Sequence, residues 1–313
     1  MDGMSVDTNP PASGVRVPWP EVHPLVRAAV EDFLGGRVAE AVTQSGGFSP
    51  AAAVRLRTEH GRRAFVKAVG PEPNADSVRI YRSELAIAAA LPESAPAPRL
   101  LTGFELEGWV ALVFEDVEGS HPELPWRRDQ LDRVLEAIDR MSAALTPSPV
   151  EVPPIGKIFG RAFHGWRDLL EEQDTAGLDP WAARHLGELA ELESGWVAAA
   201  AGDTLVHADL RADNILLTGD RVYFVDWPWA CAGAPWVDLL AMLPSVGMQG
   251  GPAPHELFTD PDPAATAVIA AFAGYLVRHA RLPDPPGLPT VRAFQRAQGV
   301  VALDWLRHRT GWA

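Results

Sequence analysis

The chain has 313 residues, of which 47% are apolar, so it can bury the core of one large domain or two modest ones and is not wholly disordered. Its single cysteine, Cys231, excludes an internal disulfide framework and a multi-cysteine zinc site. The net charge of −14 argues against nucleic acid as a general partner, because phosphate binding needs a basic surface. The same acidity favours a cationic ligand or serves solubility alone.

The N-terminal segment lacks the pattern of a secretory signal. Residues 1–20 are rich in Pro, Gly and Ser and contain no apolar core of the kind that such signals need. No part of the sequence reaches the roughly 20 apolar residues that span a bilayer. We therefore expect a soluble, cytoplasmic protein with no membrane partner, whose residues 1–20 form a flexible tail.

The next part of the chain combines two helical segments with short β-type runs. Residues 23–36 read as a helix that ends at a pair of glycines, and residues 74–91 read as a second helix that ends before Pro92. Apolar runs separated by turn residues predict five strands. These strands are expected at 38–43, 52–58, 63–69, 99–104 and 109–114.

The remainder of the chain reads as mostly helical. A helix is expected at 127–145, followed by a Pro-rich link at 146–154 and a helical stretch from 159 to 200. A small β-hairpin within 204–227 interrupts the helices, which resume at Pro235. The pattern predicts an α+β fold with a β-rich first part and a helical second part.

The embedded hairpin brings polar side chains to the ends of its strands. Its turn is expected at TGD, residues 218–220, and pairing about Asp220 sets Asn214 opposite Asp226. An amide oxygen and a carboxylate at neighbouring strand ends suit a hard divalent cation. Asp209 lies five residues before Asn214, where it can act beside the metal without binding it. Asp and Asn are also common turn formers, and Asp213 and Asp220 read in that way.

Two motifs in this segment resemble a known family. HADLRADN, residues 207–214, matches the kinase pattern H-x-D-L-x-x-x-N with Ala208 in place of the usual Arg, and VDW, residues 225–227, stands where kinases carry D-F-G. Both are similar to the aminoglycoside phosphotransferase family, which has a bilobal, protein-kinase-like fold. The resemblance implies Mg²⁺ at Asn214 and Asp226, a hydroxyl-activating Asp209, and structural roles for His207 and for Asp238 in APWVDLLAML.

The resemblance also implies a nucleotide site in the first part of the chain. Lys67 on the third expected strand would bind the phosphates of ATP or GTP, and Glu84 on the following helix would hold it. The turn SGGFSP, residues 45–50, has the position of a phosphate-covering loop. Gly46 and Gly47 would let its amides approach phosphates, or form an ordinary turn. The main chain at Glu115 and Val117 would carry the base.

The expected lobes are an N-lobe at 21–115 and a C-lobe at 116–313 that binds the acceptor, a small molecule with a hydroxyl group. In the C-lobe, four acids suit a cationic acceptor or form a solvated helix face. Two tryptophans that follow the metal-binding carboxylate can stack on a flat ligand or belong to the core. These residues are Asp168, Glu171, Glu172 and Asp174, and Trp227 and Trp229.

The expected function is transfer of the γ-phosphoryl group of ATP to an aminoglycoside-type antibiotic, and hence a role in antibiotic resistance. A kinase of another small alcohol, such as an amino alcohol, a sugar or a macrolide, has the same nucleotide-site motifs. A regulatory pseudokinase is disfavoured because Lys67, Asp209, Asn214 and Asp226 are all present. A protein kinase is disfavoured because no A-P-E signature follows Asp226.

Overall fold

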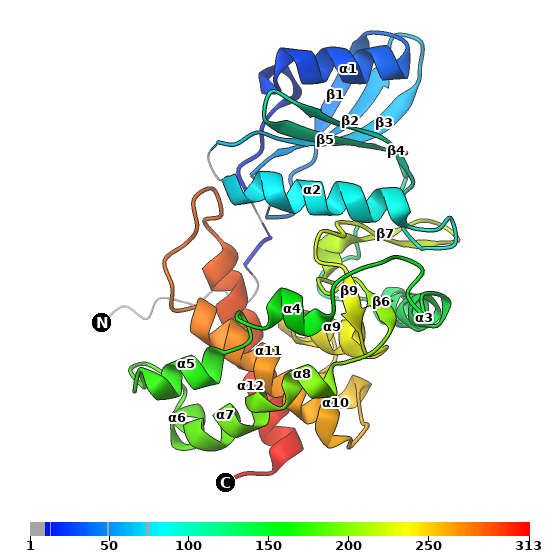
Figure 1. Ribbon diagram of the computed structural model, residues 1–313. Coiled ribbons are helices and arrows are strands. Elements are labelled where there is room, and N and C mark those ends of the chain that lie inside the picture. The colour runs from blue at the N-terminus through cyan, green and yellow to red at the C-terminus, as the bar shows by residue number, and fades with distance from the viewer. Residues whose placement is uncertain (1–9, 13, 49, 73–74) are drawn as a thin grey trace.

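The computed structural model describes residues 10–12, 14–48, 50–72 and 75–313, which form an upper part built on one sheet and a larger helical part below it (Figure 1). The upper sheet is antiparallel, with the strand order β1-β2-β3-β5-β4. All five expected strands are confirmed, and only β4 differs appreciably because it pairs with β5 for longer than expected. The strands are Val38–Thr43 (β1), Ala52–Thr58 (β2), Arg63–Val69 (β3), Leu100–Leu106 (β4) and Trp109–Phe114 (β5).

Helices cover both faces of this sheet. Helix α1 (Pro24–Leu34) packs on one face, and α2 (Ala75–Ala90) lies between the other face and the lower part (Figure 1). Because side chains alternate along a strand, β5 directs Ala111 and Val113 toward α1 and Leu112 toward α2. A strand that is buried on both sides reads as a continuous apolar run, as WVALVF does.

The described part of the expected tail packs against the upper part. Trp19 is buried in the cluster beneath α1, and the Val17 N–H donates to the Ala51 carbonyl at 3.2 Å. The structure therefore differs from the expected loose tail over residues 14–20, because burial of the large indole ring holds this segment. Residues 1–9 lie outside the described residues.

The lower part is mostly helical, as expected, and adds two short antiparallel strand pairs. The expected helical stretch 159–200 is divided into short helices, with breaks at 160–164, 172–179, His185 and Gly195; Pro180 begins the helix after the second break, as proline favours the first turn. The helices are α3 (Arg128–Ala144), α4 (Ile155–Phe159), α5 (Gly165–Glu171), α6 (Pro180–Arg184), α7 (Leu186–Ser194), α8 (Trp196–Ala199), α9 (Val237–Met248), α10 (Pro254–Leu257), α11 (Pro263–His279) and α12 (Val291–Thr310). No helix in the described ranges is long and apolar enough to cross a membrane.

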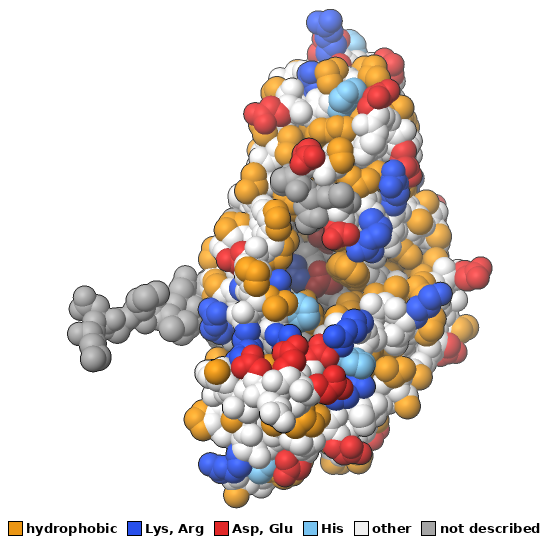
Figure 2. Space-filling view, turned by 60° about the vertical axis from the view of Figure 1, so that its left-hand side comes forward, with side chains coloured by type: hydrophobic (Ala, Val, Ile, Leu, Met, Phe, Trp, Pro, Cys, Tyr) orange, Lys and Arg blue, Asp and Glu red, His pale blue; other side chains and the backbone are white. Residues whose placement is uncertain are grey.

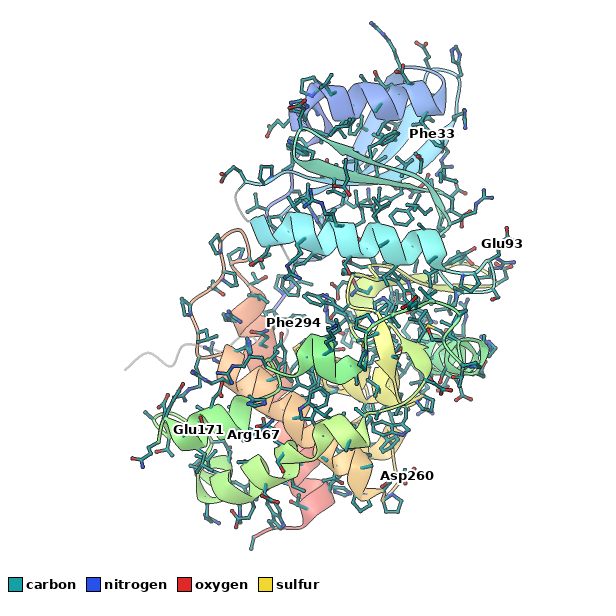
Figure 3. All side chains as sticks on the ribbon, viewed as in Figure 1. Phe33, Glu93, Arg167, Glu171, Asp260 and Phe294 are labelled. Atoms are coloured by element: carbon teal, nitrogen blue, oxygen red, sulfur yellow. The ribbon has the colours of Figure 1, made fainter. Side chains whose placement is uncertain are left out.

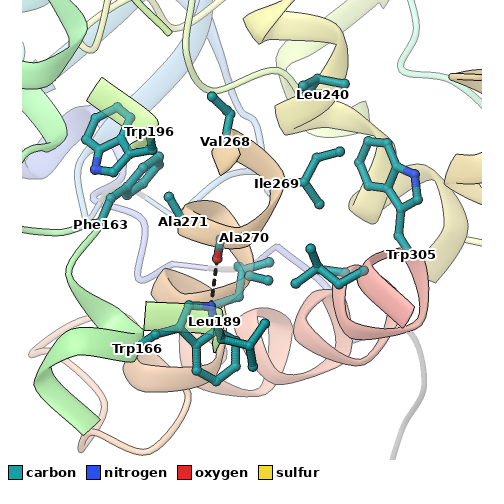
Figure 4. Close-up of a cluster of buried hydrophobic side chains, with 14 of the residues drawn as sticks. Phe163, Trp166, Leu189, Trp196, Leu240, Val268, Ile269, Ala270, Ala271 and Trp305 are labelled. Carbon is teal, nitrogen blue, oxygen red and sulfur yellow. Dashed lines mark hydrogen bonds between the residues drawn. The ribbon is translucent and has the colours of Figure 1, made fainter. Parts of the chain in front are cut away.

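A buried aromatic cluster sets α5 against α11. The indole Nε1 of Trp166 donates to the Ala270 carbonyl at 2.8 Å, the dashed bond in Figure 4. Beside it the two helix backbones touch, since a Cβ added at Gly165 would lie 2.0 Å from the Gly274 carbonyl oxygen. Glycine at position 165 therefore permits an approach that any side chain would prevent.

The small strand pairs correct the expected hairpin in two ways. Strands β7 (Ile215–Leu217) and β8 (Val222–Phe224) form the hairpin, but its turn has two residues and is centred between Gly219 and Asp220. Asn214 therefore lies opposite Val225 and not Asp226. The earlier strand β6 (Thr204–Val206) does not join this hairpin and pairs with β9 (Cys231–Gly233), which the sequence pattern did not predict.

Candidate active site

The loop that follows β6 is held by buried hydrogen bonds. The imidazole of His207 accepts the Asp209 N–H at Nδ1 (3.2 Å) and donates from Nε2 to the Val225 carbonyl (2.9 Å). The carboxylate of Asp238, in the first turn of α9, accepts the N–H groups of His207 (2.9 Å) and Ala208 (2.7 Å). These bonds hold Ala208 in the left-handed region, at a φ of 63°, and fix the direction of Asp209.

His207 is suited to positioning this loop. Burial lowers the pKa of its imidazole to about 4, so the ring is neutral at pH 7 with its proton on Nε2. Its ring packs on Trp227 at a centroid distance of 4.6 Å, and the indole N–H of Trp227 donates to the Phe224 carbonyl at 2.9 Å. Trp227 is accordingly buried and supports the loop from behind.

A buried lysine links the upper and lower parts of the molecule. The Lys67 Nζ lies 2.5 Å from Glu84 of α2 and 2.8 Å from Asp226, which follows β8. Burial alone would lower the pKa of Lys67, but Asp226 and Glu84 outweigh it and raise this pKa, so the amine is charged. The same lysine holds the pKa of Asp226 below its usual value against the effect of burial. The site thus has a fixed positive charge between two carboxylates.

Asp226 reaches this position through a turn of its own backbone. Its φ of 71° lies in the left-handed region, which costs energy for a residue with a side chain. This turn compensates for the one-residue difference between the expected and observed hairpin register. The carboxylate therefore enters the cleft beside Asn214, although the two residues do not pair in the hairpin.

Asp209 and Asn214 lie on the opposite side of the site from Glu84. The Asn214 amide nitrogen donates to the Asp209 carbonyl (2.8 Å) and to its carboxylate (3.3 Å). Burial raises the pKa of Asp209 to about 7, with Asp213 and Asp226 adding to the rise and Arg211 opposing it. The Asp209 side chain is still 29% exposed, so a ligand can reach it. A carboxylate titrating near pH 7 is suited to accept a proton from a hydroxyl group.

Arg211 is a residue that the sequence analysis missed. Its guanidinium contacts the carboxylate of Asp209 and makes two bonds of 3.0 Å to Asp213. It also lies over two aromatic rings, Phe48 of the β1–β2 loop at 5.4 Å and Phe294 of α12 at 5.9 Å. Figure 3 shows Phe294 near the junction of the upper and lower parts. The sequence did offer a signal for this residue, because Arg211 stands between Asp209 and Asp213 in the HADLRADN motif. A buried arginine needs acidic partners of this kind.

The cleft between β1–β3, α2 and the β7–β8 hairpin has the groups that a nucleotide needs. Gly46 and Gly47 line it from the β1–β2 loop, and Ala53 and Leu216 line it from β2 and β7. A second residue missed in the sequence, Arg16, lines the same cleft close to Gly47. An apolar slot with basic groups beside it suits a base and its phosphates.

The segment after β5 also lines this cleft. The Glu115 N–H donates to the Arg99 carbonyl (3.0 Å), and the Val117 carbonyl accepts from the Gly119 N–H (3.0 Å). These bonds leave the Glu115 carbonyl and the Val117 N–H among the main-chain groups of this segment that have no main-chain partner in the described residues.

The donor atoms at the site fit a magnesium ion. The Asn214 side-chain nitrogen donates to Asp209, so the side-chain oxygen of Asn214 is the atom that could bind a cation. Asp226 adds a carboxylate. Among the described residues, no group of three or more His, Cys, Asp or Glu could hold a metal ion. Magnesium is commonly held by one or two protein carboxylates together with substrate phosphates, so Asn214 and Asp226 meet its needs only alongside a nucleotide.

The residues expected to bind the acceptor are only partly brought together. A second cavity, of about 820 Å³, adjoins Asp209 and Asp226 and is lined by Asp168 and Trp229. The other expected residues do not line it: Glu172 pairs with Arg278 (2.7 Å), Asp174 pairs with Arg281 (2.5 Å), Glu171 is exposed at the outer end of α5 (Figure 3), and Trp227 faces the nucleotide cleft.

The fold and these two adjoining cavities define the class of protein. The class is a protein-kinase-like small-molecule phosphotransferase, with a five-stranded sheet above a helical part and the site between them. The model of the phosphotransferase enzyme family matches residues 41–294, which is more than half of the chain. The chain therefore belongs to the phosphotransferase enzyme family.

Solved structures show the same fold at low sequence identity. A choline/ethanolamine kinase family protein from Mesorhizobium loti matches with a TM-score of 0.56 and 17% identity, covering 90% of this chain and 94% of that one. A protein assigned as a fructosamine-3-kinase from Haemophilus somnus 129PT matches with a TM-score of 0.53 and 13% identity, covering 90% and 96%. An aminoglycoside-3'-phosphotransferase of type VIII gives 0.49 and 21%, covering 88% and 100%. A comparison with curated proteins found no significant match.

Proposed function

We propose that the protein transfers the γ-phosphoryl group of ATP to a hydroxyl group of a small molecule with Mg²⁺ as the cofactor. One observation carries the proposal: Lys67 bonds Glu84 and Asp226 at once, in a cleft that also contains Asn214 and lies next to Asp209. A fixed cation beside oxygen donors and a carboxylate of raised pKa is the combination that phosphoryl transfer uses.

In the proposed reaction, each residue acts from the position in which its contacts within the protein hold it. Lys67 binds the phosphate oxygens and remains oriented by Glu84. Asp209 accepts a hydrogen bond from the acceptor hydroxyl and takes its proton as the new P–O bond forms and the bond to the leaving ADP oxygen breaks. Asn214 and Asp226 would hold magnesium, which when bound supplies charge neutralisation at the phosphates.

The nucleotide base fits the apolar end of the same cleft. We infer that the Glu115 carbonyl and the Val117 N–H bond its edge, while Gly46 and Gly47 cover the phosphates. The guanine of GTP presents a different pattern of hydrogen-bond donors and acceptors from the adenine of ATP. A comparison of the binding of the two nucleotides therefore tests this part of the proposal.

The acceptor is the part of the reaction that the similar proteins do not define. Asp168 favours an aminoglycoside because it lines the second cavity, but its carboxylate is already paired with Arg161 at 2.6 Å. An aminoglycoside should therefore be tried as an acceptor together with amino alcohols, sugars and macrolides. If the aminoglycoside is phosphorylated, a role in drug resistance should be examined next.

The test is to incubate the protein with MgATP and such a panel and to detect one added phosphoryl group by mass spectrometry. Asp209→Asn is the control, because it keeps the shape of the side chain but cannot accept the proton. A product that forms with the wild type and is lost with the variant supports the proposal. Failure to bind MgATP would refute it whichever acceptor is used.

A further inference from the structure

The second cavity lies beside Asp209, between α2, α4, α9, α11 and α12. We propose that it binds an acceptor alcohol with a largely apolar body and one anionic group, such as a carboxylate, and that it does not favour a polycation. This inference rests on the proposed phosphoryl transfer and names the acceptor class for it. At about 820 Å³, the cavity has the size of sites for drug-sized molecules.

The walls of the cavity are predominantly apolar. The rings of Phe159 of α4 and Trp229 lie tilted to each other at a centroid distance of 6.1 Å, and Phe272 stacks on Tyr275 of α11 at 6.1 Å. Ile158 adds to the wall on the side of α4. A polyhydroxylated, polyamine sugar would lose water here without regaining hydrogen bonds, whereas an apolar body gains from the same burial.

Arginine dominates the charge of the cavity outside the catalytic groups. Apart from Asp209, Arg211 and Asp226, the charged side chains that line it are Arg161, Arg278 and Arg292 against the single Asp168. His279 also lines it, but burial lowers the pKa of its imidazole, so it adds no positive charge at pH 7. The excess is unexpected in a chain with a net charge of −14.

Two of these arginines have bonding capacity left for a ligand. Arg292 donates to the Pro283 carbonyl (3.1 Å) and to Gln295 (2.8 Å), which are neutral, and no acid among the described residues forms a salt bridge with it. Arg278 pairs with Glu172, but its Nε is buried without a hydrogen-bond partner among the described residues. The buried Nε of Arg278 is a donor that an anionic oxygen would satisfy, and the half-buried Arg292 has no acid in the described part of the chain to compete with such a ligand.

The arrangement orients the acceptor. Arg278 lies at the end of α11 and Arg292 at the start of α12, so both flank the loop that joins these helices. Figure 2 shows basic side chains beside the hollow at mid-height on this face, together with acidic ones. An anion held by the arginines and an apolar body along Phe159 and Trp229 would direct the hydroxyl group toward Asp209.

The test uses three compounds that share one alkyl chain and one hydroxyl group: a hydroxy fatty acid, its methyl ester and the matching amino alcohol. Calorimetric titration into the full-length protein, with kanamycin as a fourth ligand, measures binding without phosphoryl transfer. We expect the acid to bind about tenfold or more tightly than the ester, and more tightly again than the amine. Equal or tighter binding of the amine or of kanamycin, or no binding of any alkyl compound, would overturn the inference.

Matched variants test the role of the arginines. Arg278→Gln combined with Arg292→Gln should weaken the acid about tenfold and leave the ester unchanged, while Arg140→Gln, on the exposed face of α3, should change neither. Binding of MgATP and the melting temperature monitor folding, and Arg292→Gln alone serves if the double variant does not fold. Retention of the preference for the acid in the folded variant would overturn the assignment.

The two proposals fail in different ways. If the acid binds through the arginines but no acceptor is phosphorylated, the proposed phosphoryl transfer is wrong and the chemistry of the cavity stands. If only amines or aminoglycosides are phosphorylated, the transfer stands and the inference about the cavity is wrong.

Discussion

The two cavities of this protein differ in how their chemistry is encoded. The nucleotide cleft depends on polar residues that bond each other: Lys67 with Glu84 and Asp226, and Asn214 with Asp209. The proposed acceptor cavity depends on apolar surface from five helices, with Arg292, which forms no salt bridge among the described residues, and with the unmatched Nε of Arg278. If the proposed roles hold, the comparison teaches that the nucleotide side is built from polar side chains that bond one another, whereas the acceptor side is built mainly from apolar surface.

The largest expected effect is on the nucleotide side. Lys67→Met should lower kcat/KM for MgATP about 10²–10³-fold, because it removes the buried cation and leaves Glu84 and Asp226 unpaired. Steady-state kinetics with varied MgATP measures the change. The chain offers a matched control, since its only other lysine, Lys157, is exposed, and Lys157→Met should be neutral. Equal losses in the two variants would contradict the role of Lys67.

A smaller effect is expected on the acceptor side. Trp229→Ala should raise KM for the acceptor about 10–100-fold, because it removes a large part of the apolar wall, and should leave KM for MgATP unchanged. Because KM for the acceptor and KM for MgATP are measured on the same variant, each serves as the control for the other. A rise in both would mean that the cavities do not act separately.

The pH dependence of activity tests the electrostatic environment of Asp209. Activity needs the ionised form of Asp209, so kcat/KM should rise with pH through about 7, where the raised pKa of this carboxyl lies. Arg211 holds this pKa down, so Arg211→Gln should move the rise upward by about one pH unit or more. Asp213 raises the pKa, so Asp213→Asn should move the rise downward. Shifts in the same direction would contradict this electrostatic account.

The smallest expected effect is on stability. Gly165→Ala should lower the free energy of unfolding by about 1–3 kcal/mol, because its Cβ would meet the Gly274 carbonyl and separate α5 from α11. Thermal unfolding measures the loss. Gly187→Ala is the control, because nothing lies within 4 Å of its added Cβ and alanine favours a helix. A Gly165→Ala variant as stable as this control would show that the close approach is not needed.

The sequence predicted which residues meet in the cleft around Lys67, because those residues lie in short continuous segments. The HADLRADN loop and the strand with Lys67 are local patterns, and the strands of the upper sheet are short runs bounded by turn residues. The hairpin register was wrong by one residue, because the predicted pairing was centred on Asp220, whereas the observed two-residue turn is centred between Gly219 and Asp220. The left-handed φ of Asp226 brings its carboxylate into the cleft despite this difference in register, and no sequence pattern predicts it.

The acceptor side could not be predicted in the same way. Its cavity draws on residues from Phe48 to Gln295, and only the packing of α4, α9, α11 and α12 brings them together. Acids clustered in sequence near α5 suggested a cationic acceptor, but two of them are bound by arginines of the α11 region. Ion pairs between distant segments thus occupy two of the acids that the local sequence pattern left available for a ligand.

The most direct measurement of the central claim compares wild type and Asp209→Asn in two assays, calorimetric binding of MgATP and turnover with an acceptor found in the panel. The account predicts that the variant binds MgATP within about twofold of wild type and loses about 10²–10⁴-fold in kcat, because Asp209 meets the hydroxyl group and not the nucleotide. Unchanged turnover would contradict Asp209 as the base. A parallel loss of MgATP binding would contradict the separation of the two cavities.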